Sequence, residues 1–298
     1  MKKHLLLYLS ILILFSTGCQ KDKDQFVPYP LDGQIDNMIA ELLDEPLSFQ
    51  VNAEMSQTIQ IDKTFSINLN ADSFAGIDED VFTLDWINAR NSIQMELHNL
   101  PHFSNNTYLA PSFTFNISSK EEVTINSNEP LNLFIESDLV EDQYLYYMSN
   151  EGWTELDMSK LISTEWSDEN GLAKSGFRVS VEQFGWYTIA SKVEIAGGAV
   201  SNFCIELEGQ YTQANSKSML LLDKDVVVPI TRSLNQGLFC TTMNIPVDQT
   251  IRVISMSSLR DQEYEFYYFE TQMENGLIVV PNLESKSIEE IKLILENI

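Results

Sequence analysis

QTIQIDKTFSINL, residues 57–69, alternates apolar and polar side chains with a period of two. This alternation sends successive side chains to opposite faces of an extended chain, so it is typical of a half-buried β-strand and not of a helix. Four later runs repeat the pattern, at residues 93–97, 113–117, 131–135 and 177–181. Many short strands separated by turn residues predict a β-sandwich or a β-barrel for this part of the chain.

The last third of the chain also consists of short apolar runs broken by turn residues. We expect strands at residues 203–208, 219–222, 226–229, 237–243, 251–256, 264–270 and 277–280. Between the two groups of runs, residues 194–199 contain Gly197 and Gly198, which interrupt both helix and strand periodicity and therefore mark a linker. The sequence thus predicts two β-sandwich domains, at residues 48–195 and 200–298.

Two segments show the helical spacing of apolar residues instead. Residues 35–43 are apolar at i, i+3, i+4, i+7 and i+8, which predicts a short amphipathic helix. In residues 288–298 the apolar residues 288, 291, 294, 295 and 298 also fall on one helix face, and Ser287 with Glu290 forms a capping-box signature at their start. The predicted fold class is mainly β, with two β-sandwich domains after a tether at residues 20–47 that holds the N-terminal helix, and with an amphipathic C-terminal helix.

The N-terminus has the three parts of a secretory signal, namely two lysines, an apolar stretch at residues 5–15 and a run of small residues before Cys19. This ending resembles the lipobox of bacterial lipoproteins, in which the cysteine is acylated and becomes the first residue of the mature chain. The resemblance implies that residues 1–19 are a lipoprotein signal peptide and that Cys19 is lipidated, which anchors the tether firmly in a membrane. Ordinary signal cleavage with a free Cys19 is the alternative, because Ser16 stands where the lipobox usually has leucine.

The five residues after Cys19 are QKDKD. They resemble the short Lys/acidic tags of surface-exposed lipoproteins in the Bacteroidota, which implies a surface-exposed protein anchored in the cell outer membrane. A solvated charged tether without such a signal is the alternative.

Two further resemblances concern the predicted domains. An aromatic strand, a Gly-Trp turn and a final Phe-Gly-x-Tyr strand follow one another at residues 144–147, 152–153 and 184–187. They resemble the closing strands of Ig-like modules in bacterial surface proteins. Gly-x-Phe, x-Pro and x-Val motifs occur at residues 237–239, 245–246 and 251–253, and they resemble transthyretin-like modules. Both resemblances imply β-sandwiches, and neither transfers an active site.

Charge limits the classes of partner. Residues 1–19 contain two of the 18 basic residues and none of the 44 acidic ones, so the mature chain has a net charge of −28. Nucleic acid and anionic lipid headgroups are recognised by basic surfaces, so we expect neither as a partner. The expected partners are the membrane, reached through the lipid anchor, and envelope proteins or glycans.

Motifs for catalysis and metal binding are missing from the sequence: it contains no nucleophile elbow, zincin helix or phosphate loop. His98 and His102 have the spacing of a helical metal pair, but Pro101 lies between them. The acidic run at residues 78–80 fits a solvated turn better than a glycosidase pair. We therefore expect no catalytic residue, no metal site and no cofactor.

Aromatic side chains are the remaining candidates for ligand binding. Trp153 and Trp166 flank a polar, turn-rich segment, and Tyr264, Phe266 and Tyr268 share one face of a predicted strand. If these rings are exposed they can stack on sugars, and the protein would then be a glycan-binding accessory lipoprotein of a polysaccharide-uptake system. Packing of the same rings in a core is the alternative.

Cys204 and Cys240 remain after the signal peptide, and in an oxidising compartment they are expected to form a disulfide. Two separate buried thiols are the alternative. The sequence as a whole favours a non-enzymatic cell-envelope lipoprotein that presents β-sandwich modules for binding or for a structural role. A hydrolase with a dispersed active site is the third hypothesis, because such sites assemble from distant residues.

Overall fold

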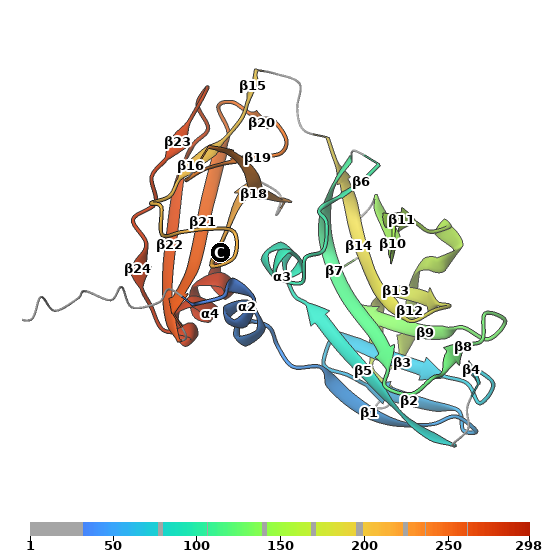
Figure 1. The fold of residues 1–298 in the computed structure, drawn as a ribbon. Coiled ribbons are helices and arrows are strands. Elements are labelled where there is room, and N and C mark those ends of the chain that lie inside the picture. Colours follow the sequence, from blue (N-terminus) through green and yellow to red (C-terminus); the bar gives the residue numbers. More distant parts are fainter. Residues whose placement is uncertain are drawn as a thin grey trace, which may run out of the picture. The chain divides into compact units, whose positions relative to one another are not determined.

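The computed structural model describes residues 32–76, 80–105, 107–138, 142–167, 171–194, 199–222, 226–235, 237–260 and 262–298. The predictions at Cys19, the signal peptide, the first part of the tether and the glycine pair of the linker lie outside these residues. The fold is mainly β, with 55% strand, 11% helix and several sheets, as the sequence predicts (Figure 1). In the described part of the chain no helix combines the length and apolar character needed to span a bilayer.

The first part of the chain forms two antiparallel sheets, one with seven strands and one with five. The seven-stranded sheet has the order β1 (Leu47–Asn52), β5 (Val81–Ala89), β7 (Thr107–Ser119), β14 (Gly185–Val193), β10 (Gln143–Ser149) and β11 (Gly152–Glu155), with β6 (Phe103–Ser104) paired to β7. The five-stranded sheet has the order β12 (Leu161–Ser167), β13 (Ala173–Val181), β9 (Leu131–Glu136), β3 (Phe65–Leu69) and β2 (Gln57–Gln60). Two short elements, β4 (Phe74–Ala75) and β8 (Thr124–Ile125), pair with each other, and a 3-10 turn covers Met158–Lys160.

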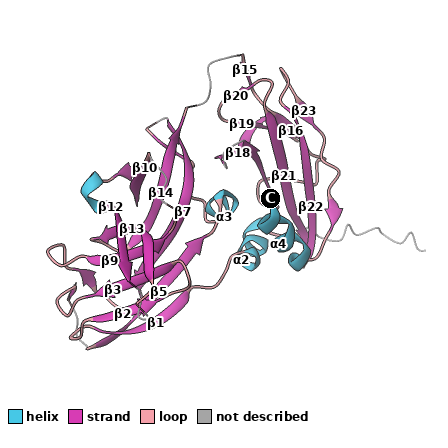
Figure 2. Ribbon diagram, turned by 180° about the vertical axis from the view of Figure 1, so that it is seen from behind, coloured by secondary structure: helices cyan, strands magenta, loops and turns pink. Residues whose placement is uncertain are grey.

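The segment at residues 57–69 forms the hairpin that its period of two predicts. β2 pairs with β3 so that Ile59 lies opposite Ile67, and Phe65, Ile67 and Leu69 are buried. These side chains join one core with buried side chains of the seven-stranded sheet, such as Trp86. The two sheets therefore pack face to face (Figure 2). The apolar side chains of each alternating strand supply the contact.

The C-terminal part of the chain forms an eight-stranded sheet. Its order is β23 (Ile278–Val279), β16 (Cys204–Glu206), β19 (Leu238–Thr241), β18 (Val226–Asn235), β17 (Ser216–Leu222), β21 (Thr250–Arg260), β22 (Glu263–Gln272) and β24 (Glu284–Ser285). β16 and β23 run parallel, and the other neighbours run antiparallel. A separate pair joins β15 (Val200–Ser201) to β20 (Ile245–Pro246).

Each face of this sheet carries a core, and β22 supplies aromatic residues to both, although its Tyr268 and Phe269 stay exposed. One face is buried under helices α2 (Ile35–Leu42) and α4 (Ile288–Asn297), where it contributes Tyr264 and Phe266. The other face forms a second core, against which Tyr267 packs. At the start of α4, the Ser287 and Glu290 side chains each accept a hydrogen bond from the other residue's backbone N–H.

The segment at residues 93–97 is a helix, so the prediction of a strand there is wrong. Helix α3 (Ser92–Leu97) begins after Asn91, whose side chain accepts a hydrogen bond from the Gln94 N–H at 2.9 Å. Its apolar residues face two cores, because Ile93 and Leu97 pack beside α2 and α4 while Met95 packs against the seven-stranded sheet. A short helix that is buried on two sides shows the same alternation as a strand.

Candidate functional site

Four polar residues meet beside α3, and we call them the Glu96 cluster. Glu96 lies in the last turn of α3, and Asn99 follows the helix with a left-handed backbone φ of 56°. His102 lies just before β6, and Lys217 reaches the cluster from β17. The cluster therefore links a helix from the first group of strands to the eight-stranded sheet.

Lys217 and Glu96 form a largely buried ion pair. The Lys217 Nζ lies 2.8 Å from Glu96 Oε1, and it also donates to the Glu96 backbone carbonyl at 2.9 Å and to Asn99 Oδ1 at 3.0 Å. A lysine ammonium has three donors, so these three acceptors use all of them. The side chains of Lys217 and Glu96 are 16% and 8% exposed.

Burial sets the charge states in the cluster. Burial raises the pKa of the Glu96 carboxyl, although the neighbouring Lys217 charge works in the opposite direction. Burial, helped by Lys217, lowers the pKa of the His102 imidazole to about 3. His102 is therefore neutral at pH 7, and its Nε2, 3.9 Å from Glu96 Oε2, forms no ion pair there. Among the described residues, neither ring nitrogen of His102 has a hydrogen-bond partner.

Two cavities open beside the cluster and share the wall formed by Glu96, Asn99, Lys217 and Thr231. The first has a volume of about 270 Å³ and extends toward α2. The second has a volume of about 300 Å³ and is lined on its other sides by mainly apolar residues, among them Leu100, Phe103, Tyr108, Pro229 and Met243. A mainly apolar cavity with a few convergent polar groups and a carboxyl of shifted pKa is the usual character of a ligand site.

The sequence did not identify this cluster. Of its four residues only His102 belongs to a pattern considered in the sequence, and Pro101 argues against its pairing with His98 as metal ligands. In the described part of the chain no group of His, Cys, Asp or Glu could hold a metal ion. Glu96 and Lys217 are 121 residues apart, and neither belongs to a motif. The only local signal is Glu96 itself, a charged residue inside the apolar run at residues 93–97.

The predicted aromatic residues are mostly buried. Trp153 is 4% exposed and its Nε1 donates to the Pro101 carbonyl at 2.6 Å, while Trp166 is partly buried with its ring 5.3 Å from that of Phe134. On β22, Tyr264 and Phe266 are 6% and 1% exposed, and Tyr268 is 39% exposed. The five rings belong to β11, β12 and β22, and they do not form one exposed platform.

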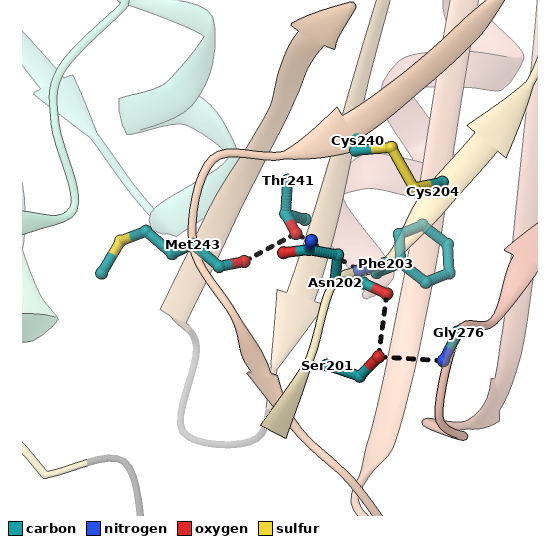
Figure 3. The surroundings of a disulfide bond; sticks show 8 residues. All are labelled: Ser201, Asn202, Phe203, Cys204, Cys240, Thr241, Met243 and Gly276. Atoms are coloured by element: carbon teal, nitrogen blue, oxygen red, sulfur yellow. Dashed lines mark hydrogen bonds between the residues drawn. A yellow bond between two sulfur atoms is a disulfide. The ribbon is translucent and has the colours of Figure 1, made fainter. Parts of the chain in front are cut away.

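The two cysteines form a disulfide, as the sequence predicts, and the alternative of two thiols is wrong. Cys204 on β16 lies directly opposite Cys240 on β19, and their Cα atoms are 4.0 Å apart (Figure 3). Next to the bond, the Thr241 hydroxyl donates to the Met243 carbonyl at 2.7 Å and accepts from the Phe203 N–H at 3.4 Å. The bond thus fastens two neighbouring strands of the eight-stranded sheet at a buried position.

No protein-family model and no curated protein sequence matches the chain.

Proposed function

We propose that this chain is a non-enzymatic lipoprotein of the bacterial cell envelope. Lipidated Cys19 would anchor it in the outer membrane, and two β-sandwich modules at the cell surface would serve for binding or as a structural part. The observation that carries the proposal is the Cys204–Cys240 disulfide. Structural disulfides persist in oxidising compartments, so the bond supports the export that the N-terminal sequence indicates.

The sheet packing supports the two modules. The core between the seven-stranded and five-stranded sheets is that of a sandwich. In the eight-stranded sheet, one core collects Val279 of β23 and Ile205 of β16 together with Val253 of β21, although these strands lie toward opposite ends of the strand order. The strands between them also contribute to this core, so it runs along one face of the sheet, as we propose for a second β-sandwich module.

The glycan-binding alternative needs exposed rings, and among the five candidates Tyr268 has the largest exposed fraction, at 39%. Stacking on a sugar needs a ring face open to solvent, and Trp153, Tyr264 and Phe266 do not offer one. We therefore propose a binding or structural role for the modules in preference to glycan binding.

Labelling of growing cells with radioactive palmitate tests the anchor. The wild-type chain and Ser16→Leu, which restores the usual lipobox leucine, should both carry label, and Cys19→Ala should carry none. Label on Cys19→Ala equal to that on wild type, or no label on wild type, would refute the lipid anchor.

Protease treatment of intact cells tests surface exposure separately. The lipidated wild-type chain should be digested while a periplasmic marker protein stays intact. A labelled chain that resists protease on whole cells but is cut after lysis would refute surface exposure and leave the anchor in place.

A further inference from the structure

We infer that the second cavity beside the Glu96 cluster binds a small organic cation with an apolar or aromatic body. This site goes beyond the proposed function, because it assigns a ligand class to one place in the chain. Its volume of about 300 Å³ exceeds that of a one-ring amine and is at the lower end of ordinary ligand pockets.

The cavity has a polar side and an apolar side. Glu96, Asn99, Lys217 and Thr231 form the wall that it shares with the first cavity. Leu100, Pro101, Phe103, Tyr108, Pro229 and Met243 contribute to the remaining walls. A molecule with a polar group at one end and an apolar body matches this division.

The hydrogen bonds of the polar wall favour a cation over an anion. The three donors of Lys217 are already used by Glu96 Oε1, the Glu96 carbonyl and Asn99 Oδ1, so an incoming anion finds no free ammonium N–H there. In contrast, Glu96 Oε2 accepts no hydrogen bond from the described residues. His102 Nε2 lies 3.9 Å from this oxygen, which is too far for a hydrogen bond. A ligand ammonium can donate to this oxygen.

Two aromatic residues add to the preference for a cation. Tyr108 is 4% exposed, and its hydroxyl donates to the Met243 sulfur at 3.0 Å, which leaves the phenol oxygen able to accept a hydrogen bond. Phe103 lines the cavity and is 46% exposed, so part of its ring is available for contact with a cation or with an aromatic body. The net charge of −26 of the whole chain also raises the local concentration of cations.

Benzylamine is a suitable probe, with benzoate as its anionic counterpart of nearly the same shape. The purified full-length chain would be titrated with each compound at pH 7 by isothermal titration calorimetry. We expect saturable binding of benzylamine in the millimolar range and at least tenfold weaker binding of benzoate. No saturable binding of benzylamine, or equal binding of the two compounds, would overturn the inference.

Variants locate the site. Glu96→Gln should weaken benzylamine binding at least tenfold, and Phe103→Ala, at a half-exposed position that folding tolerates, should weaken it at least threefold. Phe269→Ala is the matched control, because Phe269 is also half-exposed (44%) and does not line the cavity. Circular dichroism would check that each variant is folded. If Glu96→Gln does not fold, Phe103→Ala decides alone, and binding by Phe103→Ala equal to that of Phe269→Ala would overturn the inference.

Discussion

Acidification should destabilise the folded chain through His102. The imidazole is 1% exposed, and burial lowers its pKa in the folded chain to about 3 from an ordinary value of 6.5. Between these two values the unfolded chain binds a proton that the folded chain does not, so the free energy of unfolding falls as the pH falls below 6.5. A pH of 5 lies about 1.5 units below the pKa of the unfolded chain, so the free energy of unfolding is lower there by about 2 kcal/mol.

Substitution by leucine isolates this effect. His102→Leu removes the titrating ring from a position without a hydrogen-bond partner in the described chain, so at pH 7 it should change the free energy of unfolding by less than about 1 kcal/mol. At pH 5 the variant should be more stable than wild type by about 2 kcal/mol beyond any difference at pH 7. Glu96 titrates in both proteins with a raised pKa, which favours the folded state on acidification, so the comparison of variant with wild type largely removes its contribution.

Urea unfolding followed by tryptophan fluorescence at pH 7 and pH 5 would measure both free energies. His98→Leu is the matched control: burial also lowers the pKa of His98, but the Asp44 charge raises it, so its pH effect should be smaller. If the stability difference between wild type and His102→Leu is the same at pH 5 and pH 7, the reasoning about His102 is wrong.

Three more predictions concern stability, and urea unfolding measures each of them. Ile67→Ala empties a fully buried position between two sheets and should cost about 3 to 4 kcal/mol; a loss below about 1 kcal/mol would contradict that packing. Lys217→Met should cost about 3 kcal/mol at pH 7, because it leaves Glu96 buried without its partner, and adding Glu96→Gln should recover part of this loss. Reduction of the Cys204–Cys240 bond, whose cysteines are 36 residues apart, should cost about 4 kcal/mol in the chain-entropy model, and an unchanged urea midpoint would speak against it.

The sequence predicts strands well where one face of a sheet is buried. The hairpin of β2 and β3 follows from simple alternation. Successive side chains of a strand point to opposite faces, so its apolar residues share the buried face and its polar residues share the other. α3 could not be recognised in this way, since its residues face two cores and its starting signal is a single asparagine side chain. On β22 the sequence shows that Tyr264, Phe266 and Tyr268 share a face, but it does not show that α2 and α4 bury Tyr264 and Phe266 and leave Tyr268 exposed.

The Glu96 cluster could not be predicted, for a different physical reason. A buried ion pair costs desolvation energy and is stable only when tertiary structure brings the partners together with good geometry. Glu96 and Lys217 meet only because α3 packs beside the eight-stranded sheet, and the sequence around each residue contains no sign of the other. The cavity beside them depends on the same packing, so it cannot be predicted from the sequence either.

For helix α2 the local sequence shows that one face is buried, but it does not show which elements cover that face. The stripe of α2 indicates correctly that one helix face needs cover, but the cover is α4 and the eight-stranded sheet, which come more than 170 residues later. Gly33 fixes this placement, because its N–H donates to the Leu259 carbonyl at 3.1 Å and a Cβ at this position would come within 2.1 Å of the Ser258 carbonyl oxygen. Helix α2, which precedes the face-to-face sheets in the sequence, therefore shares a core with α4 and the eight-stranded sheet, which follow them. The core under α2 and α4 thus joins residues that are far apart in the sequence, and such long-range contacts are typical of slowly folding β-rich proteins.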